Sequence, residues 1–451
     1  MKFLPIFVAA VVLSACDGTA QLDGNSQLEG EPRKEVVREF ESELDATAEL
    51  TSDKRYGARS ALPKGNAYGH HRNDVGGGTG GSGGGGTVST GGGSGGGGTT
   101  GTGGSTTVDS CPAPNGVVHD GKKRFVYGTN WAWRSWAADF GGVSAWNSGG
   151  VSTAQSSVRS AMAAQKAAGA SVIRWWMFPR LVSSSIQWGA DNAPSGIGGT
   201  LVADIQAALA LAEQNNVYLM LTPFSLDNFQ PSTTESGANS RGIAAMVTDP
   251  ALRQKLVDNL IRPIAEAVQN SPYRHRMMSW DIINEPEWAM TGANLNGGAA
   301  FTPQSNLVPV THAQMLAFVN QIAATLKQYN PDAKVSVGGA GMKWGSAWKT
   351  ANIDFYQLHY YDWLYQYFPY TTYTLASAGL TNKPVVMGEF PSMGLSSIGG
   401  NPAKTAPELT ADLWNAGYAG ALSWAYNDSS FPWNPTEVKA FALQHPCETA
   451  Y

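Results

Sequence analysis

Residues 280–288 read Trp-Asp-Ile-Ile-Asn-Glu-Pro-Glu-Trp, and they end a predicted strand in a carboxylate. Residues 277–283 are apolar or aromatic with little polar interruption, as is typical of a buried strand. Pro286 cannot donate a further hydrogen bond to a neighbouring strand, so the strand is expected to end before it. Met277–Asn284 is therefore a predicted strand, with Glu285 at its exit.

A second glutamate occurs in the same local setting. Residues 383–391 read Lys-Pro-Val-Val-Met-Gly-Glu-Phe-Pro, so a short apolar strand again leads to a glutamate, Glu389, and then to a proline. Two glutamates at two strand exits are what retaining glycoside hydrolysis requires, one as proton donor and one as nucleophile, about 5–5.5 Å apart. The two stretches together predict a site with paired carboxyl groups.

Strand signals alternate with helix signals from residue 122 onward. This alternation is typical of a parallel sheet whose strands are joined by helices. The predicted strands are residues 124–128, 171–176, 217–222, 277–284, 334–338, 355–360, 384–389 and 420–426. Eight strands close a sheet into a barrel, so the predicted fold is α/β, a single (β/α)8 TIM barrel.

Local signals mark the start of several connecting helices. Asp249-Pro250 and Asn434-Pro435 each offer an N-cap side chain followed by a proline at the first helical position. Thr311 and Gln314 form the pattern of a capping box, and the helix that they open should end before Pro331.

The aromatic composition shows which part of the chain builds a core. All 15 tryptophans lie between Trp131 and Trp433, whereas the first 110 residues contain none. A single barrel with insertions therefore accounts for the later part of the 451-residue chain. The net charge of −5 and the charged fraction of 14% give no basic patch, which argues against nucleic acid and favours a neutral polar ligand. We expect a monomer.

The first 110 residues have the composition of targeting and linker segments. Residues 1–15 carry Lys2 and a short apolar run, as in a signal peptide. The run closes with Leu13-Ser14-Ala15-Cys16, which resembles the lipobox of bacterial lipoproteins, so Cys16 is the expected lipidation site. An ordinary signal peptide with an incidental cysteine is the alternative. Residues 16–75 are predicted to be disordered, and residues 76–110 form a flexible Gly/Ser/Thr-rich linker.

These segments predict where the protein is found. A lipid on Cys16 would anchor the chain to a membrane at the bacterial cell envelope or cell surface, with release from there as a further possibility. Residues 111–451 form the predicted catalytic domain, and the linker would let that domain reach an insoluble or cell-surface polymer.

Two cysteines remain once Cys16 is set aside. Cys111 and Cys447 flank the tryptophan-bearing region. The two ends of a closed barrel lie near each other, and an exported chain enters an oxidising compartment, so we predict that they form a disulfide. Two free thiols are the alternative.

The triplet Asn284-Glu285-Pro286 after a strand, followed later by Gly388-Glu389, resembles glycoside hydrolase family 5. This family belongs to the clan of retaining (β/α)8-barrel glycosidases, which carries its two glutamates on the fourth and seventh strands. The resemblance covers about residues 117–451. It implies that Glu285 is the general acid/base and that Glu389 is the nucleophile.

The resemblance also assigns two polar residues beside the glutamates. Arg174, on the second strand, matches an arginine close to the nucleophile, and a cation there keeps Glu389 ionised. A structural ion pair elsewhere in the barrel is the alternative for Arg174. Asn284 would bind the 2-hydroxyl of the sugar. The presence of both Asn284 and Glu285 in the site departs from strand alternation and implies a local distortion.

His359 and Tyr361 match the His-x-Tyr pattern of the family at the end of the sixth strand. The resemblance implies that Tyr361 orients Glu389 and that His359 bridges the acid and the substrate. A purely structural histidine is the alternative. Trp424, at the end of the eighth strand, matches the tryptophan on which the sugar at the cleavage point stacks.

Further tryptophans are candidate sugar platforms, because apolar sugar faces stack on large rigid aromatic rings. Trp131 and Trp133 lie in Asn130-Trp131-Ala132-Trp133, which resembles the opening motif of many mannan-degrading members. Trp288 follows Glu285 closely, and burial beside it would help Glu285 keep its proton. The resemblance therefore favours β-1,4-mannan as the substrate of an endo-acting enzyme.

One strand departs from the family pattern. Many members have a histidine after the third strand, whereas Thr222-Pro223-Phe224-Ser225 stands here and the next histidine is His275. This departure leaves the subfamily open, with a β-1,4-glucanase (cellulase) and an exo-β-mannosidase as alternatives. A non-catalytic polysaccharide-binding lipoprotein would keep the aromatic platforms but has no need of Arg174 and the two glutamates. A structural surface protein would have no affinity for polysaccharide.

No cluster of His, Cys and Asp with metal-ligand spacing occurs in the predicted domain, and retaining hydrolysis needs no metal. The glycine-rich tract lacks the strand, helix and lysine of a phosphate loop. We therefore predict neither a metal nor a cofactor.

Overall fold

The computed structural model describes residues 109–365, 369–370, 372–397 and 403–451. The predicted signal peptide, the lipidation site Cys16, the segment 16–75 and most of the linker lie outside the described residues. No helix in the described part of the chain is long and apolar enough to cross a bilayer.

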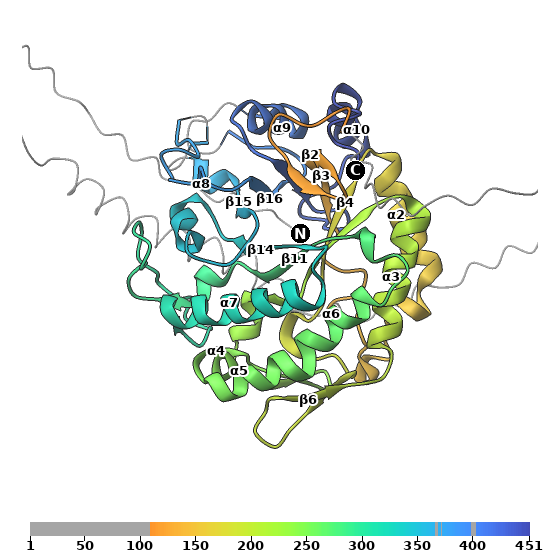
Figure 1. The fold of residues 1–451 in the computed structure, drawn as a ribbon, viewed down its shortest axis with the longest axis vertical. Coiled ribbons are helices and arrows are strands. Elements are labelled where there is room, and N and C mark those ends of the chain that lie inside the picture. The colour runs from red at the N-terminus through yellow and green to blue at the C-terminus, as the bar shows by residue number, and fades with distance from the viewer. Residues whose placement is uncertain (1–108, 366–368, 371, 398–402) are drawn as a thin grey trace, which may run out of the picture.

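Eight parallel strands form a closed barrel, which confirms the predicted fold (Figure 1). They are β3 (Val126–Asn130), β4 (Val172–Trp176), β7 (Tyr218–Thr222), β11 (Met277–Asn284), β14 (Lys334–Gly339), β15 (Tyr356–His359), β16 (Val385–Pro391) and β17 (Gly420–Trp424). β17 pairs with β3, and β11 pairs with β14, so each of the eight strands has a neighbour on both sides.

Three predicted strands have a boundary two residues away from that in the structure, among them the eighth, 420–426, because β17 ends at Trp424. The first predicted strand, 124–128, begins too early, because Arg124 belongs to β2 (Lys122–Arg124), which forms an antiparallel hairpin with β1 (Val117–His119). The seventh predicted strand, 384–389, ends too early, because β16 continues through Pro391. A proline at the last position of a strand removes only one hydrogen bond, so it did not stop the strand at Glu389. Glu389 therefore lies within the strand.

The helices surround the barrel in the positions that the connections require (Figure 1). They are α2 (Gln155–Ala167), α3 (Leu201–Asn215), α4 (Ala244–Thr248), α5 (Pro250–Leu256), α6 (Arg262–Gln269), α7 (His312–Tyr329), α8 (Asp362–Tyr365), α9 (Ala406–Asn415) and α10 (Pro435–Gln444). The predicted caps are confirmed: Asp249 accepts hydrogen bonds at the start of α5, Asn434 does so for α10, and Thr311 with Gln314 forms a capping box on α7.

The loops that follow the strands carry additional short elements. They are β5 (Ile186–Trp188) with β6 (Pro194–Ile197), β8 (Phe224–Ser225), β9 (Thr233–Glu235) with β10 (Ala238–Ser240), and β12 (Met290–Thr291) with β13 (Val310–Thr311). All of them lie in connections that start from the carboxyl ends of barrel strands. The carboxyl end is therefore the elaborated side of the barrel, where such folds carry their active sites.

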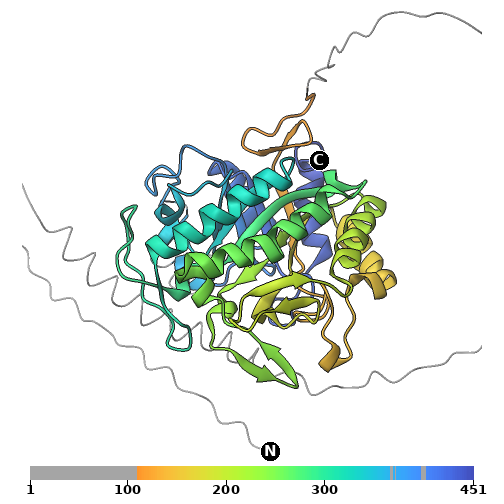
Figure 2. The same cartoon turned by 60° about the horizontal axis from the view of Figure 1, so that its bottom comes forward.

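The amino end of the barrel is closed by packing and by a disulfide. Val117, Tyr218 and Tyr451 belong to a buried apolar cluster at the starts of the strands. Cys111 and Cys447 form the predicted disulfide, with their Cα atoms 5.9 Å apart. Figure 2 shows the β1–β2 hairpin beside the C-terminus. Both described ends of the chain are thus joined at the amino end of the barrel.

Candidate active site

A bulge in β11 brings Asp281 and Asn284 to the inside of the barrel. Asp281 pairs with Ser336 of β14, but Asn284 pairs with Gly338, so two residues of β11 stand opposite one residue of β14. Such a bulge reverses strand alternation, which is the local distortion that the sequence implied. Asp281 and Asn284 both contact the buried Arg174, as described below.

Glu285 follows the bulge in a left-handed backbone conformation, with φ 48° and ψ 48°. Its N–H donates a hydrogen bond of 2.6 Å to the carbonyl of Gly338. Left-handed backbone is uncommon for a residue with a side chain, and its cost must be offset by the surrounding contacts. The turn aims the Glu285 side chain into the mouth of the barrel.

A similar irregularity positions Glu389. Leu358 pairs with Met387 and His359 pairs with Glu389, so Gly388 is the extra residue of β16. A Cβ atom at Gly388 would lie 2.4 Å from the side chain of Gln357, so only glycine fits at this bulge. His359 and Glu389 therefore face the same side of the sheet.

The two glutamates meet at the carboxyl end of the barrel. One carboxylate oxygen of Glu285, one of Glu389 and one ring nitrogen of His359 all lie within 4.8 Å of one another. The glutamate side chains are nearly buried, at 6% and 3% exposure, and His359 is fully buried. This arrangement agrees with the carboxylate separation of about 5–5.5 Å that is typical of retaining enzymes.

Glu389 is held by a cation and a phenol. Arg174 Nη1 donates a hydrogen bond of 2.7 Å to Glu389 Oε1, and the Tyr361 hydroxyl donates one of 2.7 Å to Oε2. The two hydrogen bonds fix the orientation of the carboxyl group. Glu389 is therefore in the environment that a nucleophilic carboxylate needs.

Arg174 is the centre of a buried network. Its guanidinium donates to Glu389, to Asp281 Oδ2 (2.8 Å from Nε), to Asn284 Oδ1 (2.7 Å from Nη2) and to Asn130 Oδ1 (2.9 Å from Nη1). Burial lowers the pKa of Arg174, but the charges of Asp281 and Glu389 outweigh this effect and raise it. Arg174 is therefore a permanent cation beside Glu389, as the resemblance implied.

Glu285 contacts an imidazole and an indole. His359 Nδ1 lies 2.8 Å from Glu285 Oε1, and Trp288 Nε1 donates a hydrogen bond of 3.2 Å to Oε2. Burial, aided by the charge of Arg174 and opposed by that of Glu389, lowers the pKa of His359 to about 4, so the ring is neutral at neutral pH. The two glutamates thus have different surroundings, and such a difference separates a proton donor from a nucleophile.

Asn284 offers its amide nitrogen to a ligand. Its oxygen accepts from Arg174, and Nδ2 is buried without a hydrogen-bond partner among the described residues. A buried amide N–H is costly to leave unpaired, so an incoming hydroxyl group would satisfy it. This position suits a bond to a sugar hydroxyl.

Aromatic rings form one wall beside the glutamates. Trp133, Trp176 and Trp424 contact one another, with ring centroids 5.5–6.2 Å apart. They belong to a small apolar cluster that also contains Tyr361 and, at its edge, Phe431. Trp424 and Trp133 therefore lie in the same cluster as Tyr361, which binds Glu389, and Trp424 itself is buried at 2% exposure.

Trp131 is placed differently from the prediction. Its ring stacks on Trp175 at 4.6 Å, it is 3% exposed, and it belongs to the main core. We therefore interpret Trp131 as a core residue. The sequence motif did not distinguish Trp131 from Trp133. Both directly follow β3, but Trp131 packs in the main core and Trp133 packs against the cluster beside the site.

Several residues around the site were not identified from the sequence. Asp281 and Asn130 complete the Arg174 network, and Glu287 is a fully buried acid two residues after Glu285. The segment at the end of the third barrel strand has no histidine and contacts β11 in another way. Thr222 Oγ1 donates a hydrogen bond to Asp281 Oδ2 (3.2 Å), and Ser225 pairs with Asn284. Asp281 was detectable in principle, because it lies on the same strand as the catalytic motif.

Among the described residues, one group of acidic and histidine side chains is compact enough to bind a metal ion. It consists of Glu285, His359 and Glu389. The Arg174 guanidinium already contacts this group and supplies the positive charge beside Glu389. We therefore interpret the group as an acid–base cluster.

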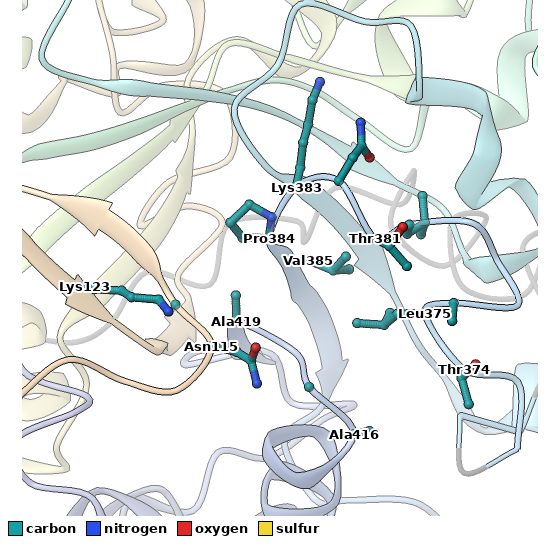
Figure 3. A pocket seen from close by; sticks show the side chains of 15 residues that line it. Asn115, Lys123, Thr374, Leu375, Thr381, Lys383, Pro384, Val385, Ala416 and Ala419 are labelled. Carbon is teal, nitrogen blue, oxygen red and sulfur yellow. The ribbon is translucent and has the colours of Figure 1, made fainter.

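A pocket of about 580 Å³ opens on the opposite end of the barrel (Figure 3). It is lined by residues at the starts of β16 and β17, among them Lys383, Pro384 and Ala419. It contains neither glutamate, so it is separate from the candidate active site.

No protein-family model matches the chain. The chain is similar to a curated mannan endo-1,4-β-mannosidase from Mytilus edulis, with 25% identity over 346 residues, covering 70% of this chain and 87% of the relative. A second mannan endo-1,4-β-mannosidase, from Cryptopygus antarcticus, is 24% identical over 364 residues, covering 69% and 83%. Among solved structures, a β-mannanase from Mytilus edulis superposes with a TM-score of 0.58 at 21% identity, covering 74% of this chain and 96% of that one. A β-1,4-mannanase from Aplysia kurodai gives 0.57 at 21%, covering 73% and 95%.

Proposed function

We propose that this chain is a retaining, endo-acting glycoside hydrolase that cleaves β-1,4-mannan. The proposal is carried by the pair of buried carboxyl groups, whose oxygens lie within 4.8 Å and which differ in their hydrogen-bond donors. Such a pair supports double displacement, with Glu285 as the acid/base and Glu389 as the nucleophile.

In the first step, a carboxylate oxygen of Glu389 attacks the anomeric carbon. The glycosidic C–O bond breaks, and Glu285 transfers its proton to the departing oxygen. The product is an ester between the sugar and Glu389, with the leaving chain released as an alcohol. Tyr361 and Arg174 orient the attacking carboxylate, and Asn284 binds the 2-hydroxyl as positive charge develops on the ring.

In the second step, Glu285 is a carboxylate and acts as a base. It takes a proton from a water molecule, whose oxygen attacks the anomeric carbon and displaces Glu389. The ester breaks, Glu389 is again ionised, and Glu285 is again protonated. Two inversions at the same carbon give net retention of the β configuration. His359 Nδ1 lies 2.8 Å from Glu285 and 3.6 Å from Glu389, so it is adjacent to the group that gives up a proton in the first step and regains one in the second.

The substrate assignment is supported by the two curated relatives, both named as mannan endo-1,4-β-mannosidases. Trp133, which is partly buried and packs against Trp424, provides an aromatic surface near the glutamates on which a mannosyl ring could stack. Neither relative favours the glucanase or the exo-mannosidase alternative.

We further propose that the enzyme is exported and anchored by a lipid on Cys16. This proposal is supported by the lipobox-like sequence at residues 13–16 and the glycine-rich segment that follows. The described chain begins at residue 109, near the amino end of the barrel, so a tether would leave from the side opposite Glu285 and Glu389.

A substrate panel tests the function. The purified protein is incubated with mannan, glucomannan, cellulose and xylan, and the products are sized over time. Endo action on mannan predicts an early fall in polymer length and a mixture of short β-1,4-mannooligosaccharides. Proton NMR of the first product formed should show the β anomer. Release of mannose alone, or hydrolysis restricted to cellulose, contradicts the proposal.

A further inference from the structure

Glu287 is a buried acid for which the proposed mechanism has no role. It lies on the short helical turn η7 (Pro286–Ala289), two residues after Glu285, and it is fully inaccessible to solvent. A carboxyl group in such a place is costly unless its oxygens are paired. Its partners therefore indicate what it does.

Both oxygens of Glu287 accept hydrogen bonds from one neighbouring segment. Oε1 accepts from Trp348 Nε1 at 2.7 Å, and Oε2 accepts from the Ala340 N–H at 3.0 Å. Ala340 directly follows β14, and Trp348 ends the helical turn η8 (Met342–Trp348). The two donors need two acceptors, which a carboxylate supplies and an amide side chain does not.

The same segment holds the backbone of Glu285. The Glu285 N–H donates to Gly338 at the end of β14, and Glu285 has the left-handed conformation described above. A Cβ atom at Gly339 would lie 3.1 Å from Glu287 Oε1, so the carboxyl group packs tightly against the end of the strand. Glu287 thus binds the turn to the segment after β14, and the same turn carries the proton donor Glu285.

We propose that Glu287 is a positioning residue for the proton donor: its buried carboxyl group ties the Glu285 turn to the Ala340–Trp348 segment and holds the Glu285 carboxyl group at the cleavage point. This inference rests on the proposed function, in which Glu285 protonates the leaving oxygen. Glu287 touches no substrate in this account. It acts through the turn and through its charge.

The charge of Glu287 adds an electrostatic effect. Burial, together with the negative charge of Glu285, raises the pKa of Glu287 to about 7, although the bonds from Trp348 and Ala340 favour its ionised form. The interaction of two charges is mutual, so an ionised Glu287 makes loss of the Glu285 proton less favourable. Other charged or titratable groups also face this turn: Glu389 and His359 lie within 4.8 Å of Glu285, and η4 (Leu226–Phe229), which carries Asp227, packs against η7.

The test uses the dependence on the leaving group. Glu287→Gln is compared with the wild type on two substrates: a β-1,4-mannooligosaccharide, whose leaving sugar must be protonated, and a dinitrophenyl β-mannooligoside, whose leaving group needs no proton. The kcat/KM value reports the first step for both. We expect a loss of about tenfold or more on the oligosaccharide and less than about threefold on the dinitrophenyl substrate. Equal losses on both substrates, or no loss on either, would overturn the inference.

The pH profile gives a second readout. Without the charge of Glu287, Glu285 should lose its proton at lower pH, so the alkaline limb of kcat/KM on the oligosaccharide should move to lower pH by about half a unit or more. If the alkaline limb of kcat/KM does not move in a folded Glu287→Gln variant, the charge of Glu287 has no effect on Glu285. A purely structural defect would lower the whole profile without moving it.

Two further variants keep the test interpretable. Trp348→Phe removes one donor to Glu287 and leaves the acid in place, so it should reproduce the leaving-group dependence if Glu287→Gln fails to fold. Asp204→Asn is the matched control, because Asp204 is equally buried and hydrogen-bonded but lies on α3. It should affect both substrates to the same extent. Failure of the wild type to cleave either substrate would reject the proposed function itself, which is a different outcome.

Discussion

Arg174 Nη1 and Glu389 Oε1 lie 2.7 Å apart, with the arginine completely buried and the glutamate nearly so. The same guanidinium contacts Asp281, so one cation serves two anions inside the barrel. Glu285 contacts the imidazole of His359 and the indole of Trp288. This asymmetry is the physical basis for assigning different roles to two residues of the same type.

The Glu389→Ala variant should lose at least about 10³-fold of the wild-type kcat, because no other group can form the sugar ester. Azide supplied with a dinitrophenyl β-mannoside should restore turnover and give an α-mannosyl azide, since it attacks from the face that Glu389 vacates. Glu285→Ala with azide should give the β-azide instead. The two products are distinguished by NMR, and the reverse outcome would exchange the two roles.

Tyr361→Phe removes the 2.7 Å hydrogen bond to Glu389 Oε2 and keeps the ring that packs beside Trp424. We expect kcat/KM to fall by about 10- to 100-fold, the effect of losing one hydrogen bond to a charged group. The melting temperature should change little. Wild-type activity in this variant would show that Arg174 alone orients the carboxylate.

Barrel closure could be predicted from the sequence, because buried parallel strands alternate with helices and each kind of element has its own period. The paired glutamates could be predicted as well, since a proline follows both Asn284-Glu285 and Glu389-Phe390. The end of β16 was misjudged for a related reason. A proline is a strong stop signal within a strand and a weak one at its last residue, and the sequence does not show which position it occupies.

The buried network was beyond sequence patterns. Asp281 and Asn284 reach Arg174 together only because β11 contains a bulge, and the bulge depends on its pairing with β14. Trp131 and Trp133 have the same local context, yet one stacks in the core and the other borders the site. Such differences are decided by tertiary contacts rather than by residue type or spacing.

Asp281→Asn should destabilise the fold, because it leaves the buried Arg174 with one anion instead of two. Breaking a buried pair costs about 3–5 kcal/mol, which should appear as a lower midpoint of urea unfolding. Asp191→Asn is a suitable control, since Asp191 pairs with Lys255 at an exposed site and its loss should lower the midpoint far less. Equal midpoints for the two variants would contradict the importance of the buried network.

The disulfide should stabilise the domain. Cys111 and Cys447 are 336 residues apart, and closing so long a loop contributes about 6 kcal/mol in the chain-entropy model. The double variant Cys111→Ser, Cys447→Ser should therefore unfold at a clearly lower temperature, while its kcat at 25 °C stays near that of the wild type. A reducing agent should lower the melting temperature of the wild type and leave that of the variant unchanged.

His359 should make the stability of the fold depend on pH. Its pKa is lowered from 6.5 to about 4, chiefly by burial, so the folded state holds the ring neutral while the unfolded state protonates it below pH 6.5. The unfolded state therefore binds more protons between these values, and stability is lost as the pH falls through this window. Protonation of the ring in the unfolded state alone lowers the free energy of unfolding by up to about 3 kcal/mol at the acid end of this window. His359→Asn keeps an N–H near Glu285 but cannot titrate, and both glutamates remain in the variant. Urea unfolding of the two proteins from pH 7 to pH 4 should show the wild type losing stability more steeply, whereas parallel curves would mean that the ring is already protonated in the folded state.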